Sequence, residues 1–86
     1  MAEQIAADIN PCDYGLVTER SEGCLYLMRN CESRPGWAEE VAVRLDGEWN
    51  LSRGAKYMVL AGDVAWAKKG DKSKLLKILG EAEKNS

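Results

Sequence analysis

Histidine is missing altogether from this 86-residue chain, and so is phenylalanine. Without an imidazole, the chain has no Ser-His or Cys-His nucleophilic pair and no histidine metal ligand. Glycine-rich phosphate-binding patterns and the HExxH zinc pattern are absent as well. The adjacent carboxylates of Glu39 and Glu40 remain, but neighbours in a strand point to opposite faces and do not share a proton. We therefore expect neither an enzyme nor a cofactor.

Long apolar runs are also lacking, since no stretch approaches the ~20 residues that span a bilayer. We expect no membrane partner. Residues 1–10 contain neither a basic segment nor an apolar run of the kind found in secretory leaders. The number of cysteines is odd, which argues against a disulfide scaffold. These features together predict a reduced, cytoplasmic protein.

Metal binding is not favoured by the spacing of Cys12, Cys24 and Cys31. Structural zinc sites use CxxC knuckles that place two thiolates on one turn. Here eleven and six residues separate successive cysteines, and no CxxC occurs. Even with Asp13 as a further ligand, we expect no metal site. The cysteines are interpreted as small buried hydrophobes with inert thiols.

What the chain does contain is the composition of one globular domain, with 45% hydrophobic and 30% charged residues. Short turns that contain glycine are expected at residues 21–23, 46–47 and 62–63. Strand-like runs lie at residues 14–20, 24–30, 39–45, 48–52, 56–61 and 64–68. Strands joined by such turns pair antiparallel. A single α+β domain over residues 1–86 is predicted, with an antiparallel meander of four to six strands.

Two of the strand-like runs need comment. In residues 24–30, Leu27 and Met28 point to opposite faces, so both faces of this strand should be partly covered. In residues 39–45, Val41, Val43 and Leu45 alternate onto one face. A helix over residues 37–45 is the competing interpretation, and the Asp-Gly turn that follows favours the strand.

The two ends of the chain have helical patterns. Residues 2–9 could form one or two helical turns before Asn10-Pro11. Near the C-terminus, Asp71 is the expected N-cap, with its side chain accepting from amides of the next turn. An apolar stripe follows and predicts an amphipathic helix that docks on the sheet. Gly80 either ends this helix or is tolerated within it. The stripe consists of Leu75, Leu76, Ile78, Leu79 and Ala82.

Charge is divided unevenly along the chain. Residues 1–50 hold four basic and ten acidic side chains, whereas residues 51–86 hold eight basic and four acidic ones. A basic cluster of this kind is either a solvated helix face or a contact surface for nucleic acid or an acidic partner. The cluster consists of Lys68, Lys69, Lys72, Lys74 and Lys77.

Tryptophan supplies the second candidate surface. Trp49 and Trp66 alternate correctly for the core and are interpreted as structural. Trp37 follows the irregular segment 31–36, in which Arg34 precedes a proline and is pushed out of helical geometry. Trp and Arg are enriched among the residues that carry binding energy at interfaces. We therefore predict a partner-binding site at Arg34 and Trp37.

One motif set crosses the first half of the chain. Pro11-Cys12, Cys31-Glu32-Ser33-Arg34, Gly36 and Trp49-Asn50 resemble the zinc-ribbon restriction-alleviation proteins of phages and prophages over about residues 11–50. Most zinc ligands are missing, because Tyr14-Gly15 and Met28 stand where that family has cysteines. The resemblance implies that packing replaces zinc, and that the protein modulates a host restriction enzyme.

These observations leave three function classes. The first is a non-catalytic protein-binding module, such as a phage or mobile-element inhibitor that blocks a host defence enzyme stoichiometrically. The second is a nucleic-acid-binding module that uses the lysine cluster, although a sequence pI near 5.1 disfavours it. The third is a structural module that self-associates through an edge strand or the terminal helix.

Overall fold

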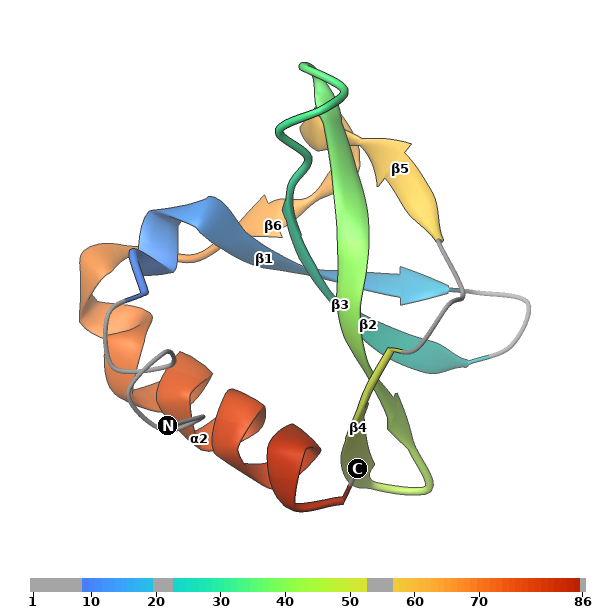
Figure 1. Cartoon of the computed structure of the whole chain (residues 1–86), viewed down its shortest axis with the longest axis vertical. Coiled ribbons are helices and arrows are strands. Elements are labelled where there is room, and N and C mark those ends of the chain that lie inside the picture. The colour runs from blue at the N-terminus through green and yellow to red at the C-terminus, as the bar shows by residue number, and fades with distance from the viewer. Residues whose placement is uncertain (1–8, 20–22, 53–56, 86) are drawn as a thin grey trace.

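The computed structural model describes residues 9–19, 23–52 and 57–85. Over these residues, a sheet of six strands packs against one C-terminal α-helix (Figure 1). The predicted α+β class, with an antiparallel sheet covered by a terminal helix, is confirmed. Residues 2–8 of the helical turns expected at residues 2–9, and most of the turn at 21–23, lie outside the described residues, and Ile9 is not helical.

The elements follow one another in a simple order. They are the short 3-10 helix η1 (Pro11–Asp13), strands β1 (Tyr14–Glu19), β2 (Cys24–Asn30), β3 (Trp37–Leu45), β4 (Glu48–Leu51) and β5 (Met58–Leu60), the 3-10 helix η2 (Ala61–Asp63), strand β6 (Ala65–Trp66), the 3-10 helix η3 (Lys69–Asp71) and the helix α2 (Lys72–Lys84).

Strand β3 is the centre of the sheet. The strand order is β4-β3-β2-β1-β6, and β5 pairs with the first residues of β3 while β4 pairs with its last residues. The strand interpretation of residues 37–45 is therefore correct. Asp46 and Gly47, with φ of 52° and 82°, form the turn into β4. Positive φ at both central residues is what a two-residue hairpin of this type requires.

The predicted hairpin at residues 62–63 is wrong. Residues 61–63 form the 3-10 helix η2, and β6 leaves β5 to pair with β1 instead. The Trp66 indole N–H donates to the carbonyl oxygen of Ala61 at 2.9 Å and fixes this turn. Gly15 makes the pairing of β6 with β1 sterically feasible, because a Cβ there would lie 2.8 Å from the Ala65 oxygen and collide with Val64.

A β-bulge corrects the prediction for the valines of β3. The register between β2 and β3 shifts where Leu27 pairs with Ala42 and Met28 pairs with Glu40, so Val41 is the extra residue. Val41 packs against the core under α2, whereas Val43 lies opposite Tyr26 on the other face. The two valines therefore do not share a face, and Leu45 is 48% exposed.

The sheet has a core on each face. Leu27 belongs to the core between the sheet and α2, and Met28 belongs to a second core that includes Ala38 and Val64. Both side chains are fully buried, so the expectation that β2 is covered on both faces is confirmed. Trp49 belongs to the first core and Trp66 packs against the second, as predicted for two structural tryptophans.

Buried Glu40 belongs to the face of the second core and organises the chain where β4 ends. Its carboxylate accepts hydrogen bonds from the Ser52 hydroxyl and from the Tyr57 N–H, the latter at 3.2 Å. Glu39, by contrast, pairs with Arg29 on the opposite face, the one on which α2 lies. The prediction that the two adjacent carboxylates point to opposite faces is correct.

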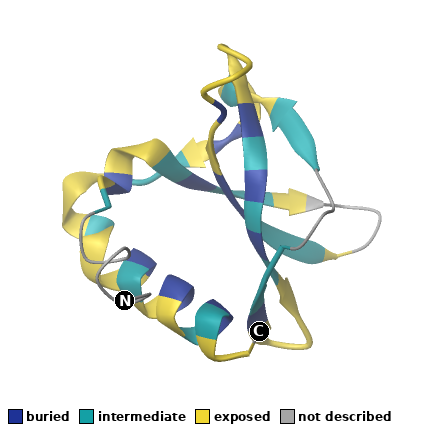
Figure 2. Ribbon diagram, viewed as in Figure 1, coloured by how far each residue is buried: buried dark blue, intermediate teal, exposed yellow. Residues whose placement is uncertain are grey.

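Helix α2 docks with the predicted stripe: Leu75, Ile78, Leu79 and Ala82 are buried, and Leu76 is half-buried (Figure 2). It passes through Gly80, so this glycine is tolerated within the helix. Asp71 is the N-cap residue, but its side chain makes no forward capping bond. Instead, it accepts from the Lys68 N–H at 3.0 Å, so the capping prediction is wrong in its direction.

Candidate partner-binding face

The face of the sheet on which α2 lies is built from rows of cross-strand neighbours. The first, which we call the covered row, is apolar and lies in or against the core under the helix. The second, which we call the polar row, comes next along the strands. The covered row consists of Leu16, Leu27, Ala42 and Leu51, and the polar row of Tyr14, Arg29, Glu39 and Met58.

The bulge at Val41 is what aligns the two rows. Leu27 and Arg29 are two residues apart and share a face of β2. Their partners on β3, Ala42 and Glu39, are three residues apart and would face opposite sides in a regular strand. The extra residue restores a common face. A sequence pattern with period two cannot reveal this, because the bulge depends on the pairing with β2.

The middle of the polar row is an ion pair. The Arg29 guanidinium donates to the Glu39 carboxylate at 3.0 Å, with the two side chains 50% and 20% exposed. The hydrogen bond to Glu39 is the main reason that the pKa of Arg29 is raised, against the opposing effect of burial. Because the pair is partly exposed, we expect it to contribute less than about 1 kcal/mol to stability.

Beyond the polar row lies the exposed pair, Trp37 and Leu60. These residues are direct cross-strand neighbours of β3 and β5, so their side chains project from the same face. Trp37 is 37% exposed and Leu60 is 52% exposed. Helix α2 packs at the other end of the sheet and does not reach them (Figure 1). Sequence reasoning found Trp37 but missed Leu60, because the pairing of β5 with β3 was not predicted.

Arg34 completes this surface. Its guanidinium lies 5.9 Å from the centre of the Trp37 ring, a cation–π geometry, and one of its nitrogens is 3.8 Å from the sulfur of Met58. The structure thus brings the two predicted partner-binding residues into contact. Arg34, Trp37, Met58 and Leu60 together are called the apolar patch below.

The loop at residues 31–36 holds Arg34 in place. Its backbone is tied at both ends: the Cys31 N–H donates to the Trp37 oxygen at 3.0 Å, and the Trp37 N–H donates to the Arg34 oxygen at 3.1 Å. Gly36 adopts φ of 88°, which favours glycine. The buried Cys31 anchors the loop from below. A loop fixed in this way loses little conformational entropy on binding.

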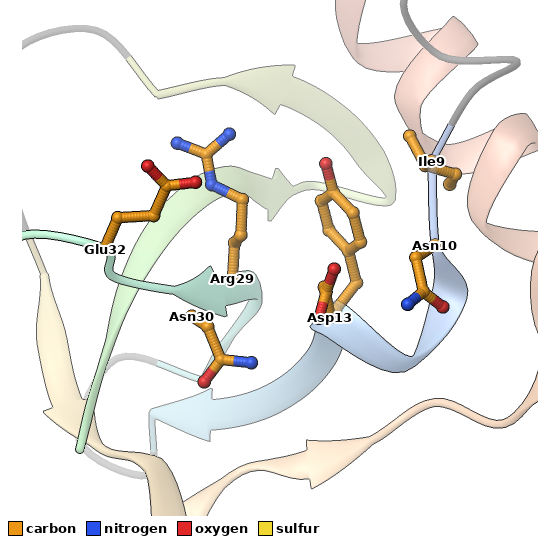
Figure 3. Close-up of a pocket in the computed structure, with 7 residues that line it drawn as sticks. Ile9, Asn10, Asp13, Arg29, Asn30 and Glu32 are labelled. Carbon is orange, nitrogen blue, oxygen red and sulfur yellow. The ribbon is translucent and has the colours of Figure 1, made fainter. Parts of the chain in front are cut away.

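A polar hollow lies beside Arg29 of the ion pair, and its lining includes no residue of the apolar patch. It has a volume of about 430 Å³ and lies between η1 and the end of β2 (Figure 3). Arg29 and Glu32 rise from one side and Asn10 and Asp13 from the other. A second hollow of about 350 Å³ shares Arg29 and Glu32 and extends to Glu39. The sequence gives no signal for either, because residues far apart in the chain line them.

The lysine cluster lies elsewhere. All five of its members are exposed: Lys68 and Lys69 precede the helix, and Lys72, Lys74 and Lys77 are in the first half of α2. Positive charge at a helix N-terminus is disfavoured by the helix dipole. The structure does not bring these lysines to the apolar patch, so the two predicted sites are separate surfaces.

The described residues contain no group of three or more His, Cys, Asp or Glu side chains that could hold a metal ion. Cys12 is exposed, so the expectation of a buried thiol fails there, whereas Cys31 is buried beside the Ser33 hydroxyl at 3.3 Å. No helix within the described part of the chain is long and apolar enough to cross a membrane. Comparison with family models, curated proteins and solved structures found no match.

Proposed function

We propose that this chain is a non-catalytic protein-binding module that holds its partner at the apolar patch. The observation that supports the proposal most is the exposed pair, in which Trp37 and Leu60 project side by side from paired strands. Because both side chains are already partly buried, covering their remaining surface stabilises a complex by less than the about 1.5–3 kcal/mol of full burial each. Arg34 adds a fixed cation that can bind a carboxylate of the partner.

The partner proposed is an enzyme of a host defence, blocked stoichiometrically in the cytoplasm. This part rests on the resemblance of residues 11–50 to restriction-alleviation proteins. The proposal needs no catalytic group or metal in this chain, because occupation of a surface is enough to inhibit.

The test is a titration of the partner at two salt concentrations with wild type and two variants. The partner is first captured from host lysate and identified. Trp37→Ala should then weaken binding by at least about 2 kcal/mol, with little dependence on salt. Leu45→Ala is the matched control, because Leu45 is also exposed and lies at the other end of β3. Equal affinities for the two variants would refute the proposal.

A second candidate is nucleic-acid binding through the lysine cluster, favoured by the five exposed ammonium groups around the start of α2. Phosphate contacts release counterions, so this binding would weaken steeply as salt rises. Lys72→Gln with Lys74→Gln should reduce that dependence, whereas Trp37→Ala should leave the affinity unchanged. The same titration therefore separates the two functions. Self-association without any partner would favour a structural module instead.

A further inference from the structure

The backbone of β5 has one edge on β3 and one edge that faces outward. The Ala61 N–H donates to the Gly36 oxygen at 2.9 Å, and the Glu40 N–H donates to the Tyr57 oxygen at 3.0 Å. Because antiparallel bonding alternates, the N–H and C=O groups of Met58 and the N–H of Leu60 point away from β3. The Leu60 carbonyl belongs to the N-cap residue of η2 and accepts the first hydrogen bond of that 3-10 helix. Within the described residues, β5 pairs with β3 alone.

The neighbouring strand shows what a closed edge looks like in this protein. β4 lies on the same side of β3, and the outward groups of Trp49 are bound by α2 and by its C-cap residue, Asn85. The Trp49 N–H donates to the Glu81 carboxylate at 2.8 Å, and the Asn85 side-chain amide donates to the Trp49 oxygen at 2.9 Å. Among the described residues, the helix therefore caps β4 at Trp49 and does not cap β5.

Of the features that protect edges from pairing, β5 has short length, at three residues, and lacks the others. Exposed edge strands usually carry a lysine, a proline or an inward-pointing charge. β5 reads Met-Val-Leu and carries none of these. Val59 packs against the second core, while Met58 and Leu60 project from the opposite face, beside Trp37. An added strand would place alternate side chains against this apolar surface.

Arg34 indicates which charge a strand added at this edge would carry. Its contacts among the described residues are the Trp37 ring and the Met58 sulfur, and neither neutralises a guanidinium. A carboxylate on the added strand would supply the missing partner, and Arg binds carboxylates with high geometric specificity.

We propose that an extended segment of the partner adds to the sheet along the outer edge of β5. The segment carries apolar residues at alternate positions and an Asp or Glu that binds Arg34. Main-chain hydrogen bonds to the N–H and C=O of Met58 and to the N–H of Leu60 give affinity, and side chains over the exposed pair give specificity, as in other strand-addition complexes. The inference rests on the proposed function, because it describes how the partner occupies the apolar patch.

Leu60→Pro tests the contribution of the outward main chain of β5 to binding, with Leu60→Ala as its control. Leu60 has φ of −66°, which is the value that proline imposes. The proline therefore removes the outward N–H and fills its direction without disturbing the bonds to β3. Alanine removes the side chain and keeps the N–H. Far-UV circular dichroism and the unfolding midpoint of both variants establish that each is folded.

The probe is a displayed library of random 12-residue peptides selected on the wild-type chain. Selected peptides should alternate apolar residues and contain Asp or Glu. They should bind Leu60→Pro about tenfold more weakly than Leu60→Ala, the effect of one lost main-chain hydrogen bond with blocked docking. In the wild-type chain, saturating peptide should slow hydrogen exchange at the Met58 and Leu60 amides.

Each other outcome overturns the inference. Equal binding to the two Leu60 variants, together with unchanged exchange at Met58 and Leu60, would exclude strand addition. If Trp37→Ala still weakened binding in that case, the proposed function would stand without it. If Trp37→Ala had no effect either, both would fail. No enrichment of peptides, or a wild-type dimer abolished by Leu60→Pro, would show that a partner segment does not occupy this edge.

Discussion

The face of the sheet on which α2 lies has two halves, both built from cross-strand neighbours, and the helix covers only one of them. The covered row is sealed by α2, and Leu27 within it is fully buried. At the other end of the same face, the exposed pair has no helix above it, and Leu60 is 52% exposed. A thin core in a small domain benefits from each apolar side chain that it can bury. Apolar residues left outside that core are therefore the ones to examine for function.

The outward edges of β4 and β5 differ in the same way, since one is covered by the helix and the other is not. α2 binds the backbone of β4 through Glu81 and Asn85, whereas β5 keeps an outward edge. One helix thus closes one half of the face and one of the two edges beside β3. The predictions below test this division, beginning with the largest expected loss of stability.

Leu79→Ala should destabilise the fold most, by about 2–5 kcal/mol, because Leu79 is buried between α2 and the sheet. The measurement is the free energy of unfolding from urea titration. Leu60→Ala is the matched change in the uncovered half and should stay within about 0.5 kcal/mol of wild type. Similar losses for the two variants would mean that the halves do not differ as described.

Gly15→Ala should cost about 1–3 kcal/mol, because the added methyl group collides with Val64 and the Ala65 carbonyl oxygen. Gly80→Ala is the control within α2, where nothing lies within 4 Å of the added methyl group. It should stabilise the helix by about 0.5–1 kcal/mol. A neutral Gly15→Ala in thermal unfolding would contradict the close approach of β6 to β1.

Asn85→Ala should cost about 1 kcal/mol, the net value of one hydrogen bond, since it frees the Trp49 carbonyl oxygen. The readout is hydrogen exchange in β4 together with the unfolding midpoint. Lys84→Ala serves as the control, because the exposed Lys84 side chain should contribute little. If the two variants behave alike, the helix does not hold β4 through this contact.

Glu39→Gln should have the smallest effect on unfolding, below about 1 kcal/mol, because its ion pair with Arg29 is partly exposed. The raised pKa of Arg29 means that its contribution is present below the unfolded pKa and is lost only as pH rises through the still higher folded pKa. Unfolding measured from neutral to mildly alkaline pH should therefore show no loss from Arg29. A decline there that Glu39→Gln abolishes would contradict this.

Local signals in the sequence predicted much of this fold. Asp46-Gly47 fixed the central hairpin, and the alternation of Leu27 and Met28 showed that β2 is covered on both faces. The direction of the capping bond at Asp71 was a local error, and the errors in the sheet concern long-range contacts. The pairing of β6 with β1 depends on the close approach at Gly15, and the bulge at Val41 depends on the register with β2.

In the candidate site, too, residues close in sequence were predicted and those brought together by strand pairing were not. Arg34 and Trp37 were predicted because they are close in sequence and flank a proline and a glycine. Leu60 and Met58 were not, because only the pairing of β5 with β3 brings them to the same surface. The polar hollow around Arg29 likewise needs η1 beside the end of β2.

The central claim is that the uncovered half of the face binds the partner. The most direct measurement is amide chemical-shift mapping of the labelled chain with and without the identified partner. The account predicts changes concentrated at residues 31–39 and 58–60, with α2 unchanged. Changes concentrated at the lysine cluster, with Trp37 and Leu60 unaffected, would contradict it.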